Sequence, residues 1–383
     1  MNETEVTKDG QRRVRPGREA TTGVHTGPGV EHVPSAARPA RGRGEQAMVP
    51  AAEFGSYYGK PIINQPVWES PDIPGYLFLG GLAGSSAVIA AGAQVTGRRG
   101  LARVAKVGAA AAAALSTVAL VHDLGRRGRF LNMLRTFKPT SPMSVGSWIL
   151  ASFGPAAAVA AGSELTGIAP GIGAAATAGA ALLGPSLATY TAALISDTAV
   201  PAWHDAHRDM PFVFAASAVT SAAGLGMLGA PVAERGPVRL LGALGGAAEL
   251  ATGRLMEARM GLARETFDEG RAARYRKGAQ ALLVAGTLTS LTARRSRVLG
   301  AVAGASLLAG SALTRFAIFE AGLASAKDPK YTVVPQRARL EAHRARPPDG
   351  PRPNGASPDS SSWRPPRSRR SRSSSSGPSC VTA

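Results

Sequence analysis

Residues 76–96, YLFLGGLAGSSAVIAAGAQVT, decide the fold class. The stretch contains 21 residues and no charged side chain, and a helix of about 20 residues crosses the roughly 30 Å hydrocarbon core of a bilayer. Within a membrane only helices and closed barrels satisfy their backbone groups, and the two-residue alternation of a barrel strand is absent here. The sequence therefore predicts a transmembrane helix over these residues.

Seven further apolar runs follow along the chain. Each is bounded by short charged stretches, as expected when charged side chains are excluded from the hydrocarbon. The predicted spans after the first are residues 105–122, 145–165, 168–196, 212–230, 238–256, 278–293 and 298–319. Gly80 and Gly84, like Gly242 and Gly246, have the spacing that lets membrane helices approach closely. We predict an all-α, polytopic membrane helix bundle of about eight transmembrane helices.

The composition agrees with a membrane core between polar tails. The 383 residues include 44 Lys and Arg against 25 Asp and Glu, and only 5% are aromatic. The mean hydropathy of 0.00 averages an apolar middle with polar ends. The single cysteine, Cys380, excludes a disulfide scaffold, a cysteine-rich zinc site and an iron–sulfur cluster held by this chain.

The predicted organisation has five parts. They are a disordered tail at 1–50, a pre-membrane segment at 51–75, the helix bundle at 76–320, a post-membrane segment at 321–336 and a disordered tail at 337–383 rich in Arg, Ser and Pro. We interpret the basic C-terminal tail as solvated, with no nucleic-acid partner. The connections on the side of the termini hold twelve basic residues against nine on the other side, which places both termini in the cytoplasm of a multi-pass plasma (inner) membrane protein.

Four segments resemble a known family. YLFLGGLAGSS at 76–86, HDLGRRGRFLNMLRTFKPTSPMSVGSW at 122–148, YTAALISDTAVPAWHDA at 190–206 and RFAIFEAGLASAKDPKYTVVPQR at 315–337 are similar to the NrfD family, which includes the integral-membrane subunit of polysulfide reductase. The resemblance extends in order from about residue 76 to 335. It implies the membrane anchor of a molybdopterin-type oxidoreductase that works in anaerobic respiration.

The resemblance also implies cofactors and partners. A family member binds a quinone, either menaquinone or ubiquinone, as its substrate, and exchanges electrons with a ferredoxin-like iron–sulfur subunit next to a molybdopterin catalytic subunit. The other expected partner is membrane lipid. From the residues themselves we expect no haem, because a transmembrane haem needs facing axial ligands, and of the six histidines only His122 lies at the end of a predicted span.

Candidate site residues are the polar side chains in or beside the spans. The resemblance assigns a quinone contact to Tyr190, whereas Leu79, Gly80, Gly81 and Gly84 of the first span offer no obvious donor. A quinone also needs a proton route, for which the candidates are His122, Asp123, Asp197 and Glu249. All but Asp197 have a structural alternative: a tyrosine bonded to a helix carbonyl, a helix-end pair at 122–123, or a Glu249 neutralised by an arginine of another helix.

The basic connection after the second span predicts a docking surface for an acidic partner. Its residues are Arg126, Arg129, Arg135 and Lys138, with Phe267 and Tyr275 as aromatic anchors from a later connection. We predict no metal site, since His204 and His207 lack further ligands, and no catalytic residue in this chain. The glycines Gly224, Gly226 and Gly229 spell a dinucleotide-binding pattern but lie inside a span, which favours helix packing.

Two other functions stay open on the sequence alone. Intramembrane acids such as Asp197 and Glu249 also suit a transporter or an ion-conducting bundle, although no repeat between the two halves supports one. A third hypothesis is an inert anchor that holds its partner at the membrane without reacting with quinone.

Overall fold

A computed structural model describes residues 4–6, 12–14, 62–123, 128 and 132–345. The chain divides into two compact units, residues 1–336 and 337–383. The described part is almost entirely helical; strands β1 (Thr4–Val6) and β2 (Arg12–Val14) pair antiparallel. Most of the tail predicted at 1–50, much of the segment at 51–75 and the tail from residue 346 on lie outside the described residues.

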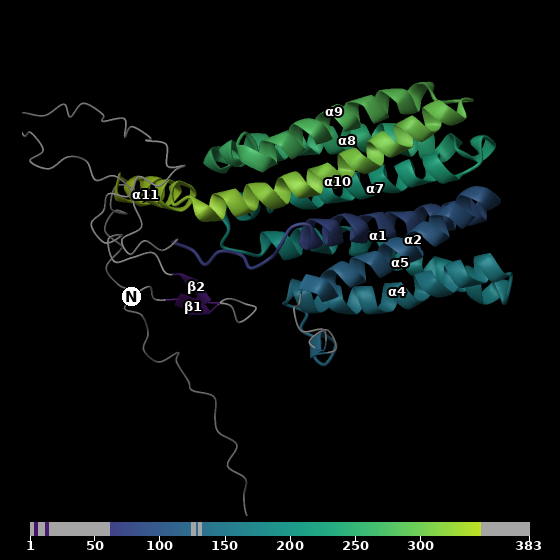
Figure 1. Ribbon diagram of the computed structural model, residues 1–383, viewed down its shortest axis with the longest axis horizontal. Helices are drawn as coiled ribbons and strands as arrows, with labels where there is room; N and C mark the ends of the chain where they lie inside the picture. The colour runs from purple at the N-terminus through teal and green to yellow at the C-terminus, as the bar shows by residue number, and fades with distance from the viewer. Residues whose placement is uncertain (1–3, 7–11, 15–61, 124–127, 129–131, 346–383) are drawn as a thin grey trace, which may run out of the picture. The chain divides into compact units, whose positions relative to one another are not determined.

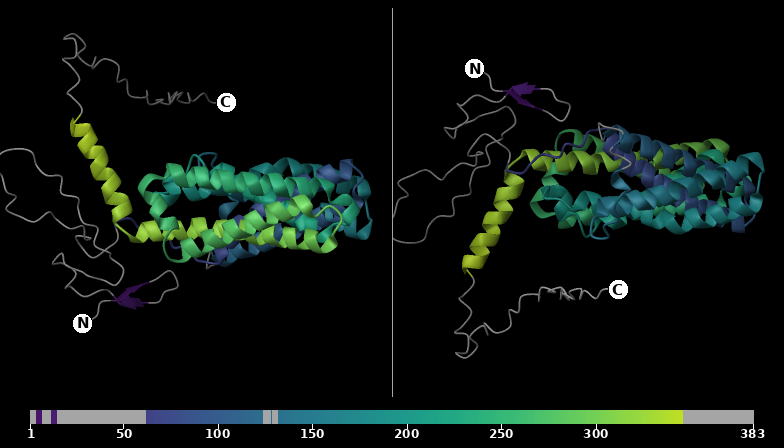
Figure 2. Two further views of the ribbon diagram at one scale, coloured as in Figure 1. Left: turned by 90° about the horizontal axis from the view of Figure 1, so that it is seen from above. Right: turned by 90° about the horizontal axis from the view of Figure 1, so that it is seen from below.

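Within the described residues, eight helices of 20 residues or more form the bundle, and each contains nearly all of one of the predicted spans. They run side by side along one axis (Figures 1 and 2). In chain order they are α1 (Asp72–Val95), α2 (Arg99–Asp123), α4 (Pro142–Thr166), α5 (Pro170–Ser196), α7 (Met210–Gly229), α8 (Gly236–Arg259), α9 (Gly270–Thr292) and α10 (Arg297–Lys327).

Six of these helices are long and apolar enough to cross a membrane: α1, α2, α4, α5, α7 and α10. The other two, α8 and α9, carry more charge, including Arg239, Glu249 and Arg254 in α8 and Arg271 and Arg274 in α9. Six spans are therefore supported by length and composition, and the count of eight stays a prediction.

The helices form two groups of four. The first group is α1, α2, α4 and α5, and the second is α7 to α10 (Figure 1). Contacts of α1 and α5 with α7, and of α1 with α10, join the groups. Because successive helices are antiparallel, the connections alternate between two ends. We call the end with the α2–α4, α5–α7 and α8–α9 connections end A, and the end with the four other connections end B.

Four shorter helical elements are also described. The helix α6 (Pro201–Asp205) and the 3-10 helix η3 (Gly261–Phe267) lie at end A, the short η2 (Val232–Glu234) lies at end B, and α11 (Lys330–Ala345) follows α10 in the chain. The Trp203 side chain of α6 is 1% exposed, and its ring nitrogen donates to the Ile318 carbonyl at 2.8 Å. Residues 337–345, predicted as the start of a disordered tail, belong to α11, where Ala, Arg, Leu and Glu favour a helix.

Glycines set the closest helix approaches. A methyl group on Gly84 of α1 would lie 2.3 Å from the carbonyl oxygen of Gly184 in α5, so these two backbones touch. Gly224 of α7 meets the Gly304 carbonyl of α10 in the same way, at 2.7 Å. The predicted role in helix packing is confirmed for Gly84 and Gly224. Dispersion contacts between such backbones can stabilise a bundle in a membrane, where the lipid is as apolar as the core of the protein.

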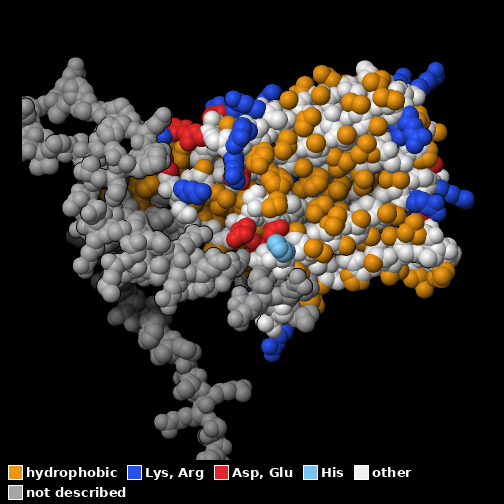
Figure 3. Space-filling view, viewed as in Figure 1, with side chains coloured by type: hydrophobic (Ala, Val, Ile, Leu, Met, Phe, Trp, Pro, Cys, Tyr) orange, Lys and Arg blue, Asp and Glu red, His pale blue; other side chains and the backbone are white. Residues whose placement is uncertain are grey.

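On the face shown in Figure 3, apolar side chains cover the middle of the bundle and charged side chains gather toward its two ends. Val95, Leu182 and Phe212 are exposed apolar side chains, with exposed fractions of 87%, 81% and 65%. Exposed apolar surface on this scale marks a membrane-facing protein. Lys106, the charge inside the second predicted span, is buried and bonds Glu164 of α4 at 2.9 Å, which explains how α2 tolerates it.

Candidate functional site

Two tyrosine hydroxyls meet inside the bundle near end A. Tyr76, in the second turn of α1, is 4% exposed, and its hydroxyl makes a short hydrogen bond with the hydroxyl of Tyr190 from α5. Tyr190 is half-buried and packs on the apolar core. Its ring lies against Gly146 of α4, where a methyl group would approach a ring carbon to 2.0 Å. A side chain at position 146 would therefore displace the ring.

A second polar pair lies one helical turn closer to end A. Asp72 precedes Tyr76 by four residues, so the two side chains are neighbours on α1. The Asp72 carboxylate lies 2.6 Å from the ring nitrogen Nδ1 of His122 at the end of α2. The His122 side chain is 73% exposed, whereas that of Asp72 is 22% exposed. An exposed imidazole, paired with a carboxylate, therefore lies about one turn from the partly buried tyrosine pair.

These four residues form what we call the tyrosine site: Asp72 and Tyr76 of α1, His122 of α2 and Tyr190 of α5. Ser116 of α2 holds the helices in register by donating to the Tyr76 carbonyl at 3.3 Å. Tyr190 and His122 were predicted from the sequence, and residues 79–84 of the first span offered no obvious donor. Tyr76, at the start of that span, was not singled out, but it supplies a hydroxyl beside Tyr190.

The other candidates near end A lie at the surface. Asp123 accepts a long hydrogen bond, 3.4 Å, from the backbone nitrogen of Glu69. Asp197 ends α5, two turns after Tyr190, and is exposed. Within the described residues, no group of three or more His, Cys, Asp and Glu side chains is placed to hold a metal; the rings of His204 and His207 stack on one another.

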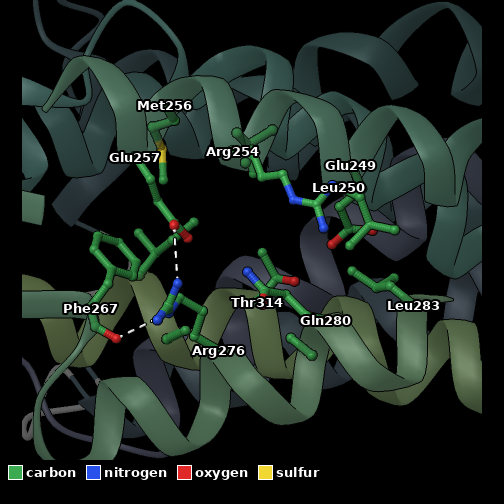
Figure 4. A pocket seen from close by; sticks show the side chains of 15 residues that line it. Glu249, Leu250, Arg254, Met256, Glu257, Phe267, Arg276, Gln280, Leu283 and Thr314 are labelled. Carbon is green, nitrogen blue, oxygen red and sulfur yellow. Dashed lines mark hydrogen bonds and ion pairs between the residues drawn. The ribbon is translucent and has the colours of Figure 1, made fainter.

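Glu249 lies in a separate pocket between α8, α9 and α10. The lining of this pocket is mostly apolar, but it includes the polar side chains of Arg254, Glu257, Arg276 and Gln280 (Figure 4). At its outer part Arg276 bonds Glu257 at 3.2 Å and donates to the Phe267 carbonyl at 3.1 Å. Glu249 lies eight residues, or about 12 Å of helix rise, deeper. Arg254 extends between the two acids toward Glu249 (Figure 4).

Glu249 itself is buried, with an exposed fraction of 2%. One carboxylate oxygen accepts from the Ser311 hydroxyl at 2.8 Å, and the other has no hydrogen-bond partner among the described residues. Its electrostatic partner is Arg315 of α10, which is 1% exposed. Arg315 donates to the Phe214 carbonyl at 2.9 Å and lies 3.5 Å above the Phe214 ring. Two of its nitrogens find no hydrogen-bond partner in the part of the chain that the structure describes.

Arg315 extends from this pocket toward the first helix group. Its Nη2 would lie 3.4 Å from a methyl group on Gly81 of α1, five residues beyond Tyr76. Sequence reasoning anticipated an arginine from a neighbouring helix beside Glu249 but did not single out Arg315. The available signal was a charged residue inside the predicted span 298–319, since intramembrane charges are costly and usually functional or paired.

The predicted docking residues are partly described. Arg135 and Lys138 are exposed at end A, while Arg126 and Arg129 lie outside the described residues. Phe267 was expected as an exposed anchor, but it is 3% exposed and packs in the core, so that expectation was wrong. Tyr275 is partly buried, and its ring packs edge-on against Phe316 at 5.6 Å.

A comparison with known proteins finds a family match. Residues 62–238 match the family model described as polysulphide reductase, NrfD. Over these residues the chain is similar to the NrfD family. The match covers α1 to α7, including all four residues of the tyrosine site, and ends at the start of α8. The predicted likeness of residues 239–335 stays a prediction. No curated protein matches the chain.

The match and the apolar helices together indicate a multi-pass membrane protein that is similar to the NrfD family over residues 62–238. They are consistent with a membrane subunit of a reductase complex. The tyrosine site lies within the matched residues, whereas the Glu249 pocket lies in helices beyond them, so the family match bears on the tyrosine site alone.

Proposed function

We propose that this protein belongs to the NrfD family and is the quinone-reactive membrane anchor of a molybdopterin-type oxidoreductase. The observation that supports the proposal is the Tyr76–Tyr190 pair, because a quinone site needs hydroxyl donors for the ring oxygens inside an apolar slot. The substrate is a menaquinone or ubiquinone, and the quinone ring binds beside the half-buried Tyr190. Its apolar tail lies among the surrounding core side chains or in the membrane.

The reaction is a two-electron exchange. Oxidation of a quinol to a quinone releases two electrons and two protons, and reduction consumes the same number. The electrons pass to or from a ferredoxin-like iron–sulfur subunit docked at end A, which continues to the molybdopterin subunit. Tyr190 and Tyr76 hold the quinone oxygen, and Asp72 and His122 move its protons to the surface. This chain holds no redox centre of its own in the proposal.

The direction of insertion belongs to the proposal as well. The termini and end A face the cytoplasm of the plasma (inner) membrane, as the twelve basic residues of the end A connections favour. Exposed Arg135 and Lys138 are part of a docking surface for an acidic partner.

Substitution of Tyr190 by Phe in the purified complex tests the proposal. Removal of the hydroxyl leaves the ring packing intact, so the complex assembles while quinol turnover falls by about tenfold to a hundredfold, the range typical of lost proton-transfer or hydrogen-bonding groups. Tyr275→Phe is the matched control, because Tyr275 is also a partly buried tyrosine but packs against Phe316, away from the site. Equal quinol kinetics in the wild-type and Tyr190→Phe complexes would remove Tyr190 from the mechanism.

A second candidate, proton or ion conduction through the bundle, is favoured by the Glu249 pocket. A carboxylate with an unpartnered oxygen, beside an arginine with two unpartnered nitrogens, leaves room for polar contacts that the described side chains do not supply. If the complex couples quinone chemistry to proton transfer, Glu249 is the residue that links them. The Glu249→Gln variant would then abolish proton transfer across the membrane of reconstituted vesicles, measured as acidification, while quinol turnover continues.

A further inference from the structure

End B carries a large excess of positive charge. Nine basic residues lie at or next to its four connections: Arg98, Arg99, Arg103, Lys106, Arg235, Arg239, Arg294, Arg295 and Arg297. The acidic side chains among the described residues of this end are Glu164, which Lys106 and Arg103 contact, and Glu234, which accepts from the Leu101 backbone at 2.7 Å. The other seven basic side chains have no carboxylate partner among the described residues. Lys and Arg side chains gather at this end of the bundle (right in Figure 3).

Four of these arginines surround one cleft. Arg235 and Arg239, at the start of α8, face Arg294 and Arg295 of the α9–α10 connection. The backbone of Gly236, the first residue of α8, also lines the cleft, so amide groups of a helix N-terminus add to the positive potential. Four guanidinium groups and a helix N-terminus on one concave surface form a site for an anion.

Arg235 shows that the cleft is built into the fold. It is 5% exposed, with Nε donating to the Ala230 carbonyl at 2.7 Å, while Nη1 is buried without a hydrogen-bond partner among the described residues. Burial, and then the charge of Arg297, lower the pKa of Arg235. Nη1 packs against the backbone of Gly300 in α10, where a methyl group would approach it to 2.6 Å, so Arg235 is fixed between the helices that form the cleft. Guanidinium groups bind phosphate oxygens well, and Arg239, Arg294 and Arg295 also line the cleft.

The surroundings of the cleft indicate where the anion comes from. Exposed apolar side chains continue from the cleft down the outer faces of its three helices. They are Leu240 and Leu244 of α8, Leu288 and Leu291 of α9, and Val298 and Val302 of α10. Arg239 donates to the Leu291 carbonyl at 3.1 Å, which joins the basic rim to this apolar strip. A free phosphate would not use the strip, but the acyl chains of a phospholipid would cover it.

We propose that the cleft binds the phosphate headgroup of an anionic phospholipid, whose acyl chains lie against the exposed side chains of α8, α9 and α10. The short connections of end B, such as the three residues between α1 and α2, put the arginines at headgroup depth. Basic pockets between membrane helices are where such lipids bind selectively. The site is separate from the tyrosine site and does not depend on the proposed quinone reaction.

Native mass spectrometry of the full-length protein tests the site. Phosphatidylglycerol and phosphatidylcholine with identical acyl chains are titrated onto the detergent-purified protein. Each cation near a membrane surface strengthens anionic-lipid binding about fivefold, so Arg294→Gln/Arg295→Gln weakens phosphatidylglycerol binding about 25-fold. Arg98→Gln/Arg99→Gln removes the same charge from the same end, but these arginines do not line the cleft, so phosphatidylglycerol binding should stay close to that of the wild type.

Three results would overturn the proposal. An equal loss in both double variants would mean diffuse charge attraction, and equal binding of the two lipids by wild type would mean no headgroup site. Displacement of the lipid by inorganic phosphate would assign the cleft to a free anion. Both arginines are exposed, so the variants are expected to fold; if the double variant does not, Arg294→Gln alone predicts a loss of about fivefold.

Discussion

Glu249 and Arg315 provide the sharpest test of how the bundle tolerates charge in its interior. They are 2% and 1% exposed and come from different helices. Removing one member of a buried charge pair costs about 3 to 5 kcal/mol, because the other charge stays buried without compensation. Arg315→Met also removes the hydrogen bond to Phe214 and the contact with its ring, so this variant lies at the upper end of that range.

The double variant Glu249→Gln/Arg315→Met removes both buried charges. Its unfolding free energy should fall by about 1 to 3 kcal/mol, less than the sum of the single losses, which gives a coupling energy of at least about 3 kcal/mol. The Ser311 hydroxyl can still donate to the amide oxygen that replaces the carboxylate in this variant. The residual cost comes from the lost contacts of Arg315.

Detergent unfolding followed by tryptophan fluorescence measures the four free energies, because Trp203 is fully buried against Phe319 at end A. Arg254→Met is the control: Arg254 extends toward Glu249 but is exposed, so its removal should cost less than about 1 kcal/mol. Additive single effects, with a coupling below about 0.5 kcal/mol, would show that the two charges do not stabilise one another and would refute this reasoning.

Three further predictions concern the site, the topology and the pH dependence. Gly146→Val displaces the Tyr190 ring and should lower quinol turnover of the assembled complex as much as Tyr190→Phe does; normal turnover would show that the ring position is unimportant. Cys380, the single cysteine, should react with an impermeant maleimide in inverted membrane vesicles and not in intact cells, and the reverse pattern would reverse the insertion. Burial raises the pKa of Tyr331 above its ordinary value near 10, so the neutral tyrosine stabilises the fold fully below about pH 10, and this stabilisation is lost at higher pH. The Tyr331→Phe variant has no phenol to titrate, so its unfolding midpoint should not change over the alkaline range in which the midpoint of the wild type falls. The same fall in both proteins would contradict this assignment.

Hydrophobicity along the chain was enough to predict the helix bundle. Every predicted span lies almost wholly inside one long helix, since exclusion of charge from the membrane leaves a strong pattern in the sequence. The hydrophobic pattern is weaker in α8 and α9, because Glu249 and the arginines of both helices interrupt it. Glycine spacing also predicted close packing, because at Gly84 and Gly224 a side chain would collide with a neighbouring backbone.

The candidate site was harder to predict. Tyr190 and His122 were found, but their partners Tyr76 and Asp72 come from another helix, and the sequence does not show which helix faces overlap. Tyr76 lies at the start of the first span, where a tyrosine is common as an interfacial anchor, so its type alone gave no signal. Phe267 was misplaced for a related reason, because a phenylalanine in a charged connection can point either outward or into the core.

Purification of the intact complex with its quinone tests the central claim most directly. The chain is isolated by affinity in mild detergent, the co-purifying subunits are identified, and bound quinone is extracted and measured against the Tyr190→Phe complex. Our account predicts an iron–sulfur subunit, a molybdopterin subunit and quinone in the wild-type preparation, with less quinone in the variant. A chain that purifies without redox partners and without quinone, under conditions in which a control complex survives, would contradict the account and favour a transporter or an inert anchor.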